Sequence, residues 1–166
     1  MCFTVCLQQE AQKIAQRKRL TLDELAALFL PSNKISGFAH PNLLMIKNTN
    51  PTILTAGQWG LYPEWAKDNS IQKHTLNARI ETLTEKPSFA PYMENRCIII
   101  IDGFYEWQWL SKSGSKKQEY YIESAQEATL SLAGLWHVKN NITTFTIITQ
   151  PANTLMAKIH NTKQRM

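Results

Sequence analysis

The sequence predicts a single α+β domain, in which an antiparallel sheet forms most of the body and a few helices flank it. Its 166 residues match the usual length of one domain, and a hydrophobic content of 43% is enough to form a core. Between Pro31 and Pro151, short apolar runs alternate with turn signals, as expected of strands joined by tight connections. Helical patterns occur before and after this stretch. We therefore expect helices near the two ends of the chain and strands between them.

The elements follow in order along the chain. Residues 9–19 form a basic stretch that predicts a first helix. Thr21 and Glu24 have the spacing of a capping box, which predicts a second helix carrying Leu25, Leu28 and Phe29. Seven strands are expected next, at residues 43–46, 52–56, 97–101, 104–110, 119–123, 129–138 and 143–149. Pro151 then opens a last short helix that ends near His160.

Composition and charge narrow the class of protein. Residues 1–9 lack the pattern of a signal peptide, and the longest apolar runs are too short to cross a bilayer, so we expect a cytoplasmic protein without a membrane partner. The three cysteines fit no disulfide framework, and a single C-x3-C pair lacks the further ligands of a zinc site. We expect neither a metal nor a cofactor. The net charge of +5 permits a polyanionic partner without identifying one.

Cys2 directly follows the initiator methionine. Removal of Met1 would leave an α-amine and a thiol on neighbouring carbons, and both groups are partly deprotonated near neutral pH. Such an aminothiol can condense with an aldehyde to an imine, which the thiol closes to a five-membered thiazolidine ring. The position alone more often holds a small buried residue of a first strand. Other residues must decide between the two interpretations.

The segment 104–109 alternates aromatic and polar residues. The period of a strand puts its three odd-numbered rings on one face and the other three side chains opposite, namely Phe104, Glu106 and Gln108. Glu106 is thereby flanked by bulky rings, a desolvated setting that suits a general acid or base. An edge strand would instead expose this carboxylate to water.

Three further places carry polar or aromatic groups of interest. If extended, residues 75–82 place an amide, a guanidinium and a carboxylate on one side, those of Asn77, Arg79 and Glu81. Such a row suits a phosphate and a sugar oxygen, or an ordinary solvated face. His160 could shuttle a proton, although a lone histidine is usually structural. Two indoles in residues 59–65 indicate either buried core or a platform on which nucleobases stack.

Together these motifs resemble the SOS response-associated peptidase (SRAP) family, whose members include abasic-site processing proteins that crosslink to single-stranded DNA. Each motif alone is weak, but their joint occurrence in this order is specific. The resemblance covers the whole chain through Met1-Cys2, Trp59-Gly60 with Pro63 and Trp65, Asn77-Ala78-Arg79 with Glu81-Thr82, Arg96-Cys97, Gly103 to Trp107, Gly134-Leu135-Trp136 and Ile159-His160. It implies an SRAP-like fold with a barrel-like core of antiparallel sheets, as a single domain over residues 1–166.

The resemblance also implies the chemistry and assigns roles to four positions. Cys2, exposed by removal of Met1, would bond as a thiazolidine to the ring-opened aldehyde of an abasic site, which protects the site during the DNA damage response. Asn77 would orient the sugar or the terminal amine. Glu106 would act as acid and base for imine and ring closure. His160 would donate a proton to the sugar oxygen during ring opening.

The partner implied by the resemblance is single-stranded DNA containing abasic sites. Arg79 would grip the phosphate beside the lesion, and Trp65 would be a stacking wedge. Neither a metal nor a cofactor is implied. When bound to DNA, the protein would be associated with the nucleoid. The sequence leaves the oligomeric state open, with a monomer as the default expectation.

The chain also departs from the family pattern. Many relatives begin Met-Cys-Gly-Arg-Phe, whereas Phe3 and Thr4 stand here, so a basic DNA contact is absent at the fourth position. The Asp-Arg-Met-Pro that usually follows the histidine is replaced by residues 161–166, in which an insertion precedes Arg165-Met166. Relatives continue for several dozen residues, so we expect a domain truncated at its C-terminal end, with an unusually short member of the family as the alternative.

Two other classes of function use the same residues. A thiol peptidase or amidase would attack an acyl carbon with Cys2, with His160 or Glu106 as base and Asn77 near the oxyanion. A non-covalent reader of modified or single-stranded DNA would bind through Arg79 and the aromatic loop, with Cys2 incidental.

Overall fold

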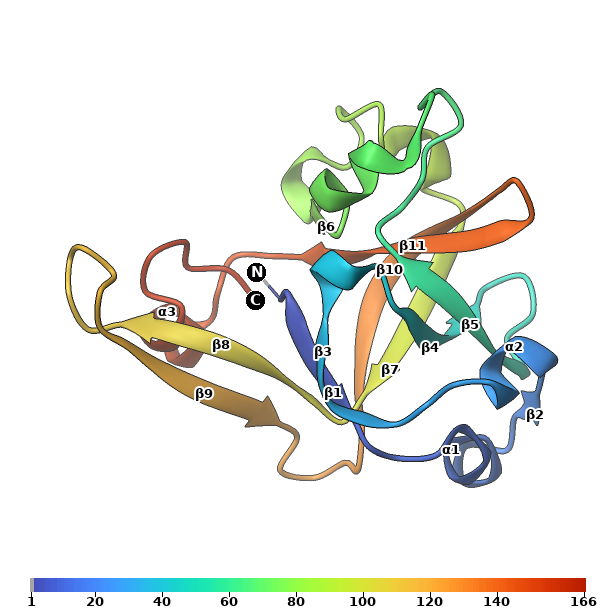
Figure 1. The fold of residues 1–166 in the computed structure, drawn as a ribbon, viewed down its shortest axis with the longest axis horizontal. Coiled ribbons are helices and arrows are strands. Elements are labelled where there is room, and N and C mark those ends of the chain that lie inside the picture. The colour runs from blue at the N-terminus through green and yellow to red at the C-terminus, as the bar shows by residue number, and fades with distance from the viewer. Residues whose placement is uncertain (1) are drawn as a thin grey trace.

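A closed barrel of five strands forms the centre of the protein (Figure 1). The computed structural model describes residues 2–166. The barrel strands lie side by side in the order β5 (Ile53–Trp59), β4 (Asn42–Lys47), β7 (Arg96–Ile101), β10 (Leu130–Lys139) and β11 (Ile142–Thr149). The barrel closes because β5 also pairs with β11, where Phe145 lies opposite Trp59. The rings of these two residues stack in the core with their centroids 6.4 Å apart. The predicted α+β class with a barrel-like core is thus confirmed.

A four-stranded antiparallel sheet extends from the barrel. Its order is β3 (Ser32–Ser36), β1 (Thr4–Leu7), β8 (Gly103–Trp109) and β9 (Lys117–Glu123). β7 passes into β8 through Asp102 alone, so the barrel and the sheet are continuous. β1 is an inner strand in which Thr4 pairs with both Ser36 and Tyr105. This arrangement fixes Cys2, two residues before Thr4, at one end of β1.

Short elements complete the chain. α1 (Ala11–Lys18) buries Ile14 and Ala15 in the core, as expected of the first predicted helix. The segment between β5 and β7, green in Figure 1, gathers at one end of the molecule beside β11. It contains β6 (Asn77–Arg79) and three 3-10 helices, η2 (Asn69–His74), η3 (Ile80–Thr82) and η4 (Ala90–Tyr92). A further 3-10 helix, η1 (Gly37–Ala39), joins β3 to β4.

α3 (Thr154–Ile159) carries His160 at its C-terminal end. The Oδ1 atom of Asn153 caps the helix by accepting a hydrogen bond from the amide of Met156 at 2.9 Å. Met156 and Ile159 are buried, so the helix is docked as the sequence predicts. It begins later than predicted, because Pro151 forms an isolated β-bridge with Arg165 instead.

The predicted capping box is wrong. Thr21 belongs to β2 (Thr21–Leu22), where its amide donates to the carbonyl of Thr52 beside β5. This pairing moves the start of the helix by two residues, and Asp23 caps α2 (Glu24–Ala27) by accepting from the amide of Ala26 at 2.8 Å. The second helix is therefore only four residues long.

The predicted antiparallel meander also needs correction. The seven predicted strands are all present within a few residues of their expected bounds, but three of the strand pairings are parallel: β2 with β5, β5 with β11, and β6 with β11. The parallel pairing of β5 with β11 is the contact that closes the barrel. Such contacts join distant segments, which the local alternation of residue types does not reveal.

Candidate active site

Cys2 lies immediately before β1 and is buried, with 8% of its surface exposed. Its thiol makes a weak hydrogen bond to the carbonyl of Thr4 at 3.9 Å. Burial, and secondarily the negative charge of Glu106, raises the pKa of the Cys2 thiol to about 12. The thiol is therefore protonated near neutral pH, and a base must accept its proton before the sulfur can act as a nucleophile.

Asn77 lies on β6, where the parallel pairing with β11 places it next to Cys2. Its Nδ2 atom donates a hydrogen bond to the carbonyl of Cys2 at 2.9 Å. Its Oδ1 atom is buried and has no hydrogen-bond partner among the described residues 2–166. Buried polar atoms are almost always paired in folded proteins. The amide oxygen of Asn77 is thus an acceptor ready for a donor that enters the site.

Glu106 and His160 are both buried and face each other. Nδ1 of His160 lies 3.9 Å from Oε1 of Glu106. Glu106 is buried because its strand, β8, is an inner strand of the sheet, between β1 and β9. The alternative of a water-exposed edge carboxylate is thereby excluded. Because Glu106 also acts electrostatically on Cys2, and Cys2 contacts Asn77, the structure brings together all four residues predicted as catalytic. They come from four separate parts of the chain: the residues before β1, β6, β8 and the C-terminal end of α3.

His160 also makes a hydrogen bond that defines its ring. Its Nδ1 atom lies 3.0 Å from the carbonyl oxygen of Arg165. A carbonyl can only accept, so Nδ1 carries a proton in this contact. In the neutral ring, Nε2 is then the nitrogen with the lone pair, and the one that can take up and release a proton.

The predicted row of Asn77, Arg79 and Glu81 is only partly right. β6 ends at Arg79 and the chain turns into η3, so Glu81 leaves the face that the first two residues share. Its carboxylate instead binds the guanidinium of Arg165 through two hydrogen bonds of 3.0 and 2.9 Å. These bonds hold the pKa of the Glu81 carboxyl below its ordinary value. Arg79 itself is exposed.

The two indoles of residues 59–65 have different environments. Trp59 is fully buried, and its Nε1 atom donates to the carbonyl of Leu76, so it belongs to the core. Trp65 is 54% exposed, and its Nε1 atom donates to the carbonyl of Pro87 at 3.1 Å. Of these two indoles, Trp65 is therefore the one that presents an aromatic surface to a ligand.

Lys139 of β10 holds the loop that carries Trp65. Its ammonium group donates to three backbone carbonyls of this loop, those of Pro63 at 3.2 Å, Glu64 at 2.7 Å and Ala66 at 2.5 Å. It also lies 4.3 Å from the centre of the Tyr62 ring, within the range of a cation–π contact. The loop is therefore fixed before any ligand arrives.

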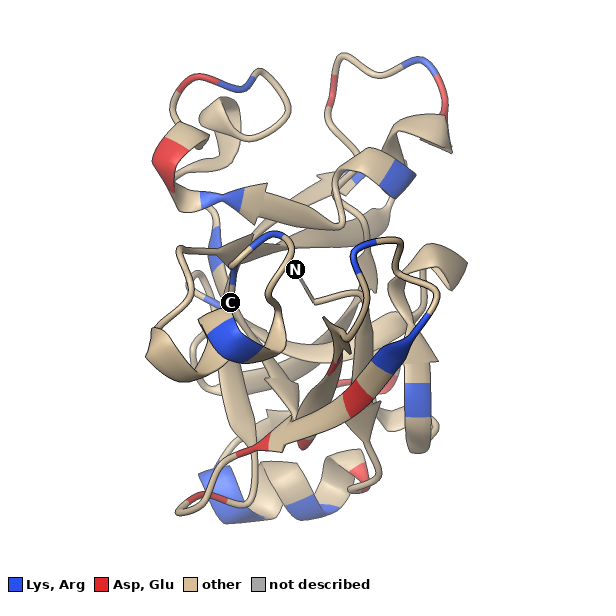
Figure 2. Cartoon of the chain, turned by 90° about the vertical axis from the view of Figure 1, so that its left-hand side faces the viewer, with Lys and Arg blue, Asp and Glu red and all other residues tan. Residues whose placement is uncertain are grey.

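Basic residues occur on elements near the start of β1. Figure 2 shows Lys and Arg on several of the elements around this point and the end of the chain. Exposed basic residues on the elements that supply the candidate site include Arg79, Lys158 and Lys163. The positive charges of these residues favour a negatively charged ligand.

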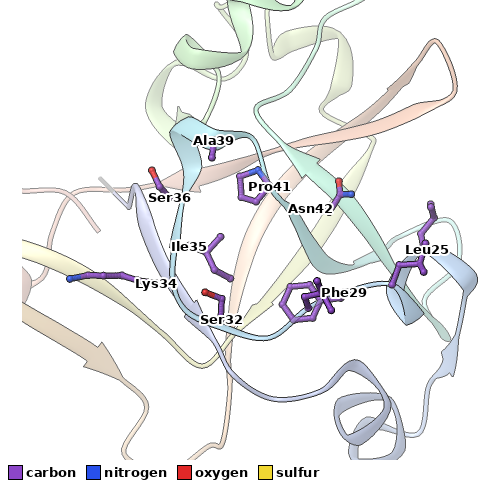
Figure 3. Close-up of a pocket in the computed structure, with 11 residues that line it drawn as sticks. Leu25, Phe29, Ser32, Lys34, Ile35, Ser36, Ala39, Pro41 and Asn42 are labelled. Atoms are coloured by element: carbon purple, nitrogen blue, oxygen red, sulfur yellow. The ribbon is translucent and has the colours of Figure 1, made fainter.

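A cavity of about 440 Å³ lies elsewhere, between β3, β4 and the segment after α2 (Figure 3). Its walls include Leu25, Phe29, Ile35 and Pro41, and none of the predicted site residues lines it. Within residues 2–166 there is no group of three or more His, Cys, Asp or Glu side chains arranged to hold a metal ion. The helices of the described part of the chain are all too short or too polar to cross a membrane.

Sequence reasoning missed two residues of this region. The sequence shows Arg165 only as part of a motif displaced by an insertion, and its pairing with Glu81 joins positions too far apart for a local pattern to reveal. Lys139 carries no sequence signal, because a lysine near the end of a strand is usually solvated. Their roles follow only from the contacts of the folded chain.

Comparisons with known proteins agree with this architecture. A solved structure of a protein from Bacteroides thetaiotaomicron superposes with a TM-score of 0.87 at 34% identity, covering 99% of this chain and 75% of that chain. A second, from Bordetella bronchiseptica, has a TM-score of 0.77 at 21% identity over 99% of this chain and 82% of that chain, and shows the fold alone.

Curated relatives share a name. The chain is 38% identical over 148 residues to abasic site processing protein YoqW of Bacillus subtilis (strain 168), which covers 80% of this chain and 63% of that protein. It is 30% identical over 163 residues to abasic site processing protein HMCES of Xenopus tropicalis, which covers 78% of this chain and 48% of that protein. The chain thus spans less than two thirds of the length of these relatives. The sequence profile of the SOS response associated peptidase (SRAP) family matches residues 1–166, and the chain belongs to that family.

Proposed function

We propose that this protein traps abasic sites in single-stranded DNA as covalent DNA–protein crosslinks and thereby protects them. The nucleophile is Cys2, made N-terminal by removal of Met1. The observation that carries the proposal is the convergence of Cys2, Asn77, Glu106 and His160, three of them buried and Asn77 half-buried. The names of the relatives support abasic sites as the substrate class.

The proposed chemistry has three steps. Ring opening breaks the C1′–O4′ bond of the abasic sugar: the C1′ hydroxyl gives its proton to Nε2 of His160, which passes it on to O4′, and an aldehyde is left at C1′. The α-amine of Cys2 attacks this aldehyde, and loss of one water gives an imine. The sulfur then bonds to the imine carbon, the thiol proton moves to the nitrogen, and the thiazolidine closes. The product is protein plus DNA less one water.

Glu106 carries the proton in the last step. The Cys2 thiol has a pKa raised to about 12 by burial, so sulfur attack at neutral pH requires a base beside it. Glu106 is the carboxylate whose charge the thiol senses, and it can pass the proton on to the imine nitrogen. The buried Oδ1 atom of Asn77 is suited to accept a hydrogen bond from the α-amine or from a sugar hydroxyl.

A thiol peptidase would need the same residues. A peptidase thiol normally reacts as a thiolate stabilised by its surroundings, whereas burial disfavours the thiolate of Cys2. This difference favours a reaction in which the amine attacks first and the sulfur closes the ring.

Intact-mass spectrometry tests the proposal directly. Purified protein is measured before and after incubation with a single-stranded oligonucleotide containing one abasic site, and with a peptide mixture as the comparison substrate. We expect loss of Met1 from the protein, and then a heat-stable species with the summed mass of protein and DNA less one water. Peptide turnover without this species would contradict the proposal.

Trp65 is proposed to stack on a base beside the lesion. Base–aromatic stacking contributes about 1–3 kcal/mol per base, so Trp65→Ala is expected to weaken binding of single-stranded DNA by about tenfold or more. Fluorescence anisotropy with an oligonucleotide carrying the unreactive tetrahydrofuran analogue measures this binding. Leu28→Ala, which truncates another exposed apolar side chain, is the control and is expected to bind normally. Equal affinities of the two variants would remove Trp65 from the DNA interface.

A further inference from the structure

Arg165 has an unusually complete set of partners for a residue in the segment that follows α3. It is buried, with 8% of its surface exposed. Its Nη1 and Nη2 atoms donate to the two carboxylate oxygens of Glu81, Nη2 also donates to the carbonyl of Thr149 at 2.7 Å, and Nε donates to the Thr149 hydroxyl at 3.2 Å. Such a fork-to-fork pair fixes the orientation of a guanidinium as well as its position.

The backbone around Arg165 is fixed too. Gln150 and Met166 exchange two hydrogen bonds, at 2.8 and 3.0 Å, and the amide of Ala152 donates to the carbonyl of Gln164. Together with the bridge between Pro151 and Arg165, these bonds continue the end of β11 as a short antiparallel ladder. The carbonyl of Arg165 therefore has a defined place that depends on both the ladder and the side-chain anchor.

The residues inserted between His160 and Arg165 form a loop that leaves the contacts of Arg165 in place. Gln164 adopts a left-handed conformation, with φ of 48°, and its amide donates to the carbonyl of His160 at 2.8 Å, so the chain turns back immediately. The side-chain amide of Asn161 makes hydrogen bonds with both the amide and the carbonyl of Trp109 on β8. The loop is thus tied down at both of its ends.

We propose that Arg165 is a positioning residue that holds His160 in a single tautomer through its own backbone carbonyl. Its guanidinium is anchored on Glu81 and Thr149, and its carbonyl accepts the Nδ1 proton of His160 at 3.0 Å. The neutral ring then keeps its lone pair on Nε2, the nitrogen that takes up and delivers the proton. The inference rests on the proposed role of His160 as the proton donor to the sugar oxygen.

Arginine and lysine differ at such a site. Lysine keeps the positive charge but is a point donor, and it cannot bind both oxygens of Glu81 and both oxygens of Thr149 in one plane. Arg165→Lys therefore leaves the carbonyl in the chain and removes only what holds it in place. Glu81→Gln is a milder change on the other side of the pair, because the Glu81 side chain is 42% exposed.

The first measurement is the tautomeric state of His160 by long-range ¹H–¹⁵N NMR on protein labelled at histidine. His160→Gln assigns the signal among the four histidines. We expect the Nδ1-protonated form alone in the unaltered protein and a mixture of tautomers in Arg165→Lys, with a smaller change in the same direction in Glu81→Gln. Lys163→Ala, an exposed residue of the same loop, is the control and is expected to leave the spectrum unchanged.

The second measurement is the rate of crosslinking to an abasic oligonucleotide. General acid–base catalysis contributes roughly 10²–10⁴-fold, and Arg165→Lys is expected to lose about tenfold of it, because only part of the His160 population then has the reactive tautomer. Binding of tetrahydrofuran-containing DNA is expected to stay the same, since the charge is retained. A structural role alone would change thermal stability without changing the tautomer ratio.

The outcomes of these measurements separate the proposed role of Arg165 from the proposed role of His160. A single tautomer and an unchanged rate in both Arg165→Lys and Glu81→Gln would overturn the role of Arg165. If Arg165→Lys does not fold, Glu81→Gln decides the question alone. Crosslinking by His160→Gln at the rate of the unaltered protein would instead refute the proposed role of the histidine, while the tautomer measurement would still report on Arg165.

Discussion

Replacing Cys2 with alanine is expected to abolish the heat-stable crosslink completely while leaving non-covalent DNA binding intact. Alanine retains the α-amine after removal of Met1, so an imine with the abasic aldehyde can still form. Without the sulfur no ring closes, and the imine hydrolyses when the protein is denatured. Denaturing electrophoresis and intact mass after incubation with an abasic oligonucleotide measure the loss, and anisotropy with tetrahydrofuran-containing DNA measures the binding.

Cys6→Ala is the matched control for this substitution. Cys6 is also a buried free thiol and lies on β1, four residues further along the chain. Its removal tests whether any thiol near the site suffices, and we expect this variant to crosslink normally. A heat-stable adduct from Cys2→Ala in the same yield as from Cys6→Ala would refute the thiazolidine and assign the covalent bond to another nucleophile.

Replacing Glu106 with glutamine is expected to slow crosslinking by about 10²–10⁴-fold, the usual contribution of a general acid–base group. The substitution preserves size and hydrogen-bonding capacity but removes the group that accepts the thiol proton. Because the pKa of the Cys2 thiol is raised to about 12, little thiolate forms without that base at neutral pH. Single-turnover kinetics on a gel, with protein in excess over abasic DNA, measure the rate.

Glu119→Gln provides the same chemical change outside the site. Glu119 lies on β9, the strand next to Glu106, and its exposed carboxylate pairs with Lys34. This variant is expected to react at the rate of the unaltered protein. Thermal melting of both variants separates loss of the base from loss of folding. A folded Glu106→Gln protein with an unchanged rate would assign the proton transfer to another group.

The sequence predicts those parts of the fold that local patterns encode. β8 and β11 are long and rich in apolar or aromatic residues, so the alternation of residue types predicts both strands. The position of His160 is predicted by the amphipathic helix that ends beside it. β3 reads Ser-Asn-Lys-Ile-Ser, and only Ile35 is buried, so its strand character comes from pairing with β1. No local pattern in the sequence predicts such a strand.

The family resemblance predicts the residues of the candidate site one by one. The sequence does not predict the contacts that hold these residues in place. Trp59 and Trp65 stand in one motif, yet one lies in the core and the other on the surface, because the chain leaves the barrel between them. Glu81 falls in the predicted row only on the assumption of an extended strand, and pairing with Arg165 takes it elsewhere. These outcomes depend on contacts between distant segments, which single-sequence patterns do not contain.

The burial of Cys2 has a consequence for the durability of the protein. Peroxides and alkylating agents attack the thiolate rather than the thiol, and they need access to it. A sulfur that is shielded by the core and protonated at physiological pH resists both. We therefore expect the Cys2 thiol to stay reduced under the oxidising conditions that damage nucleic acids.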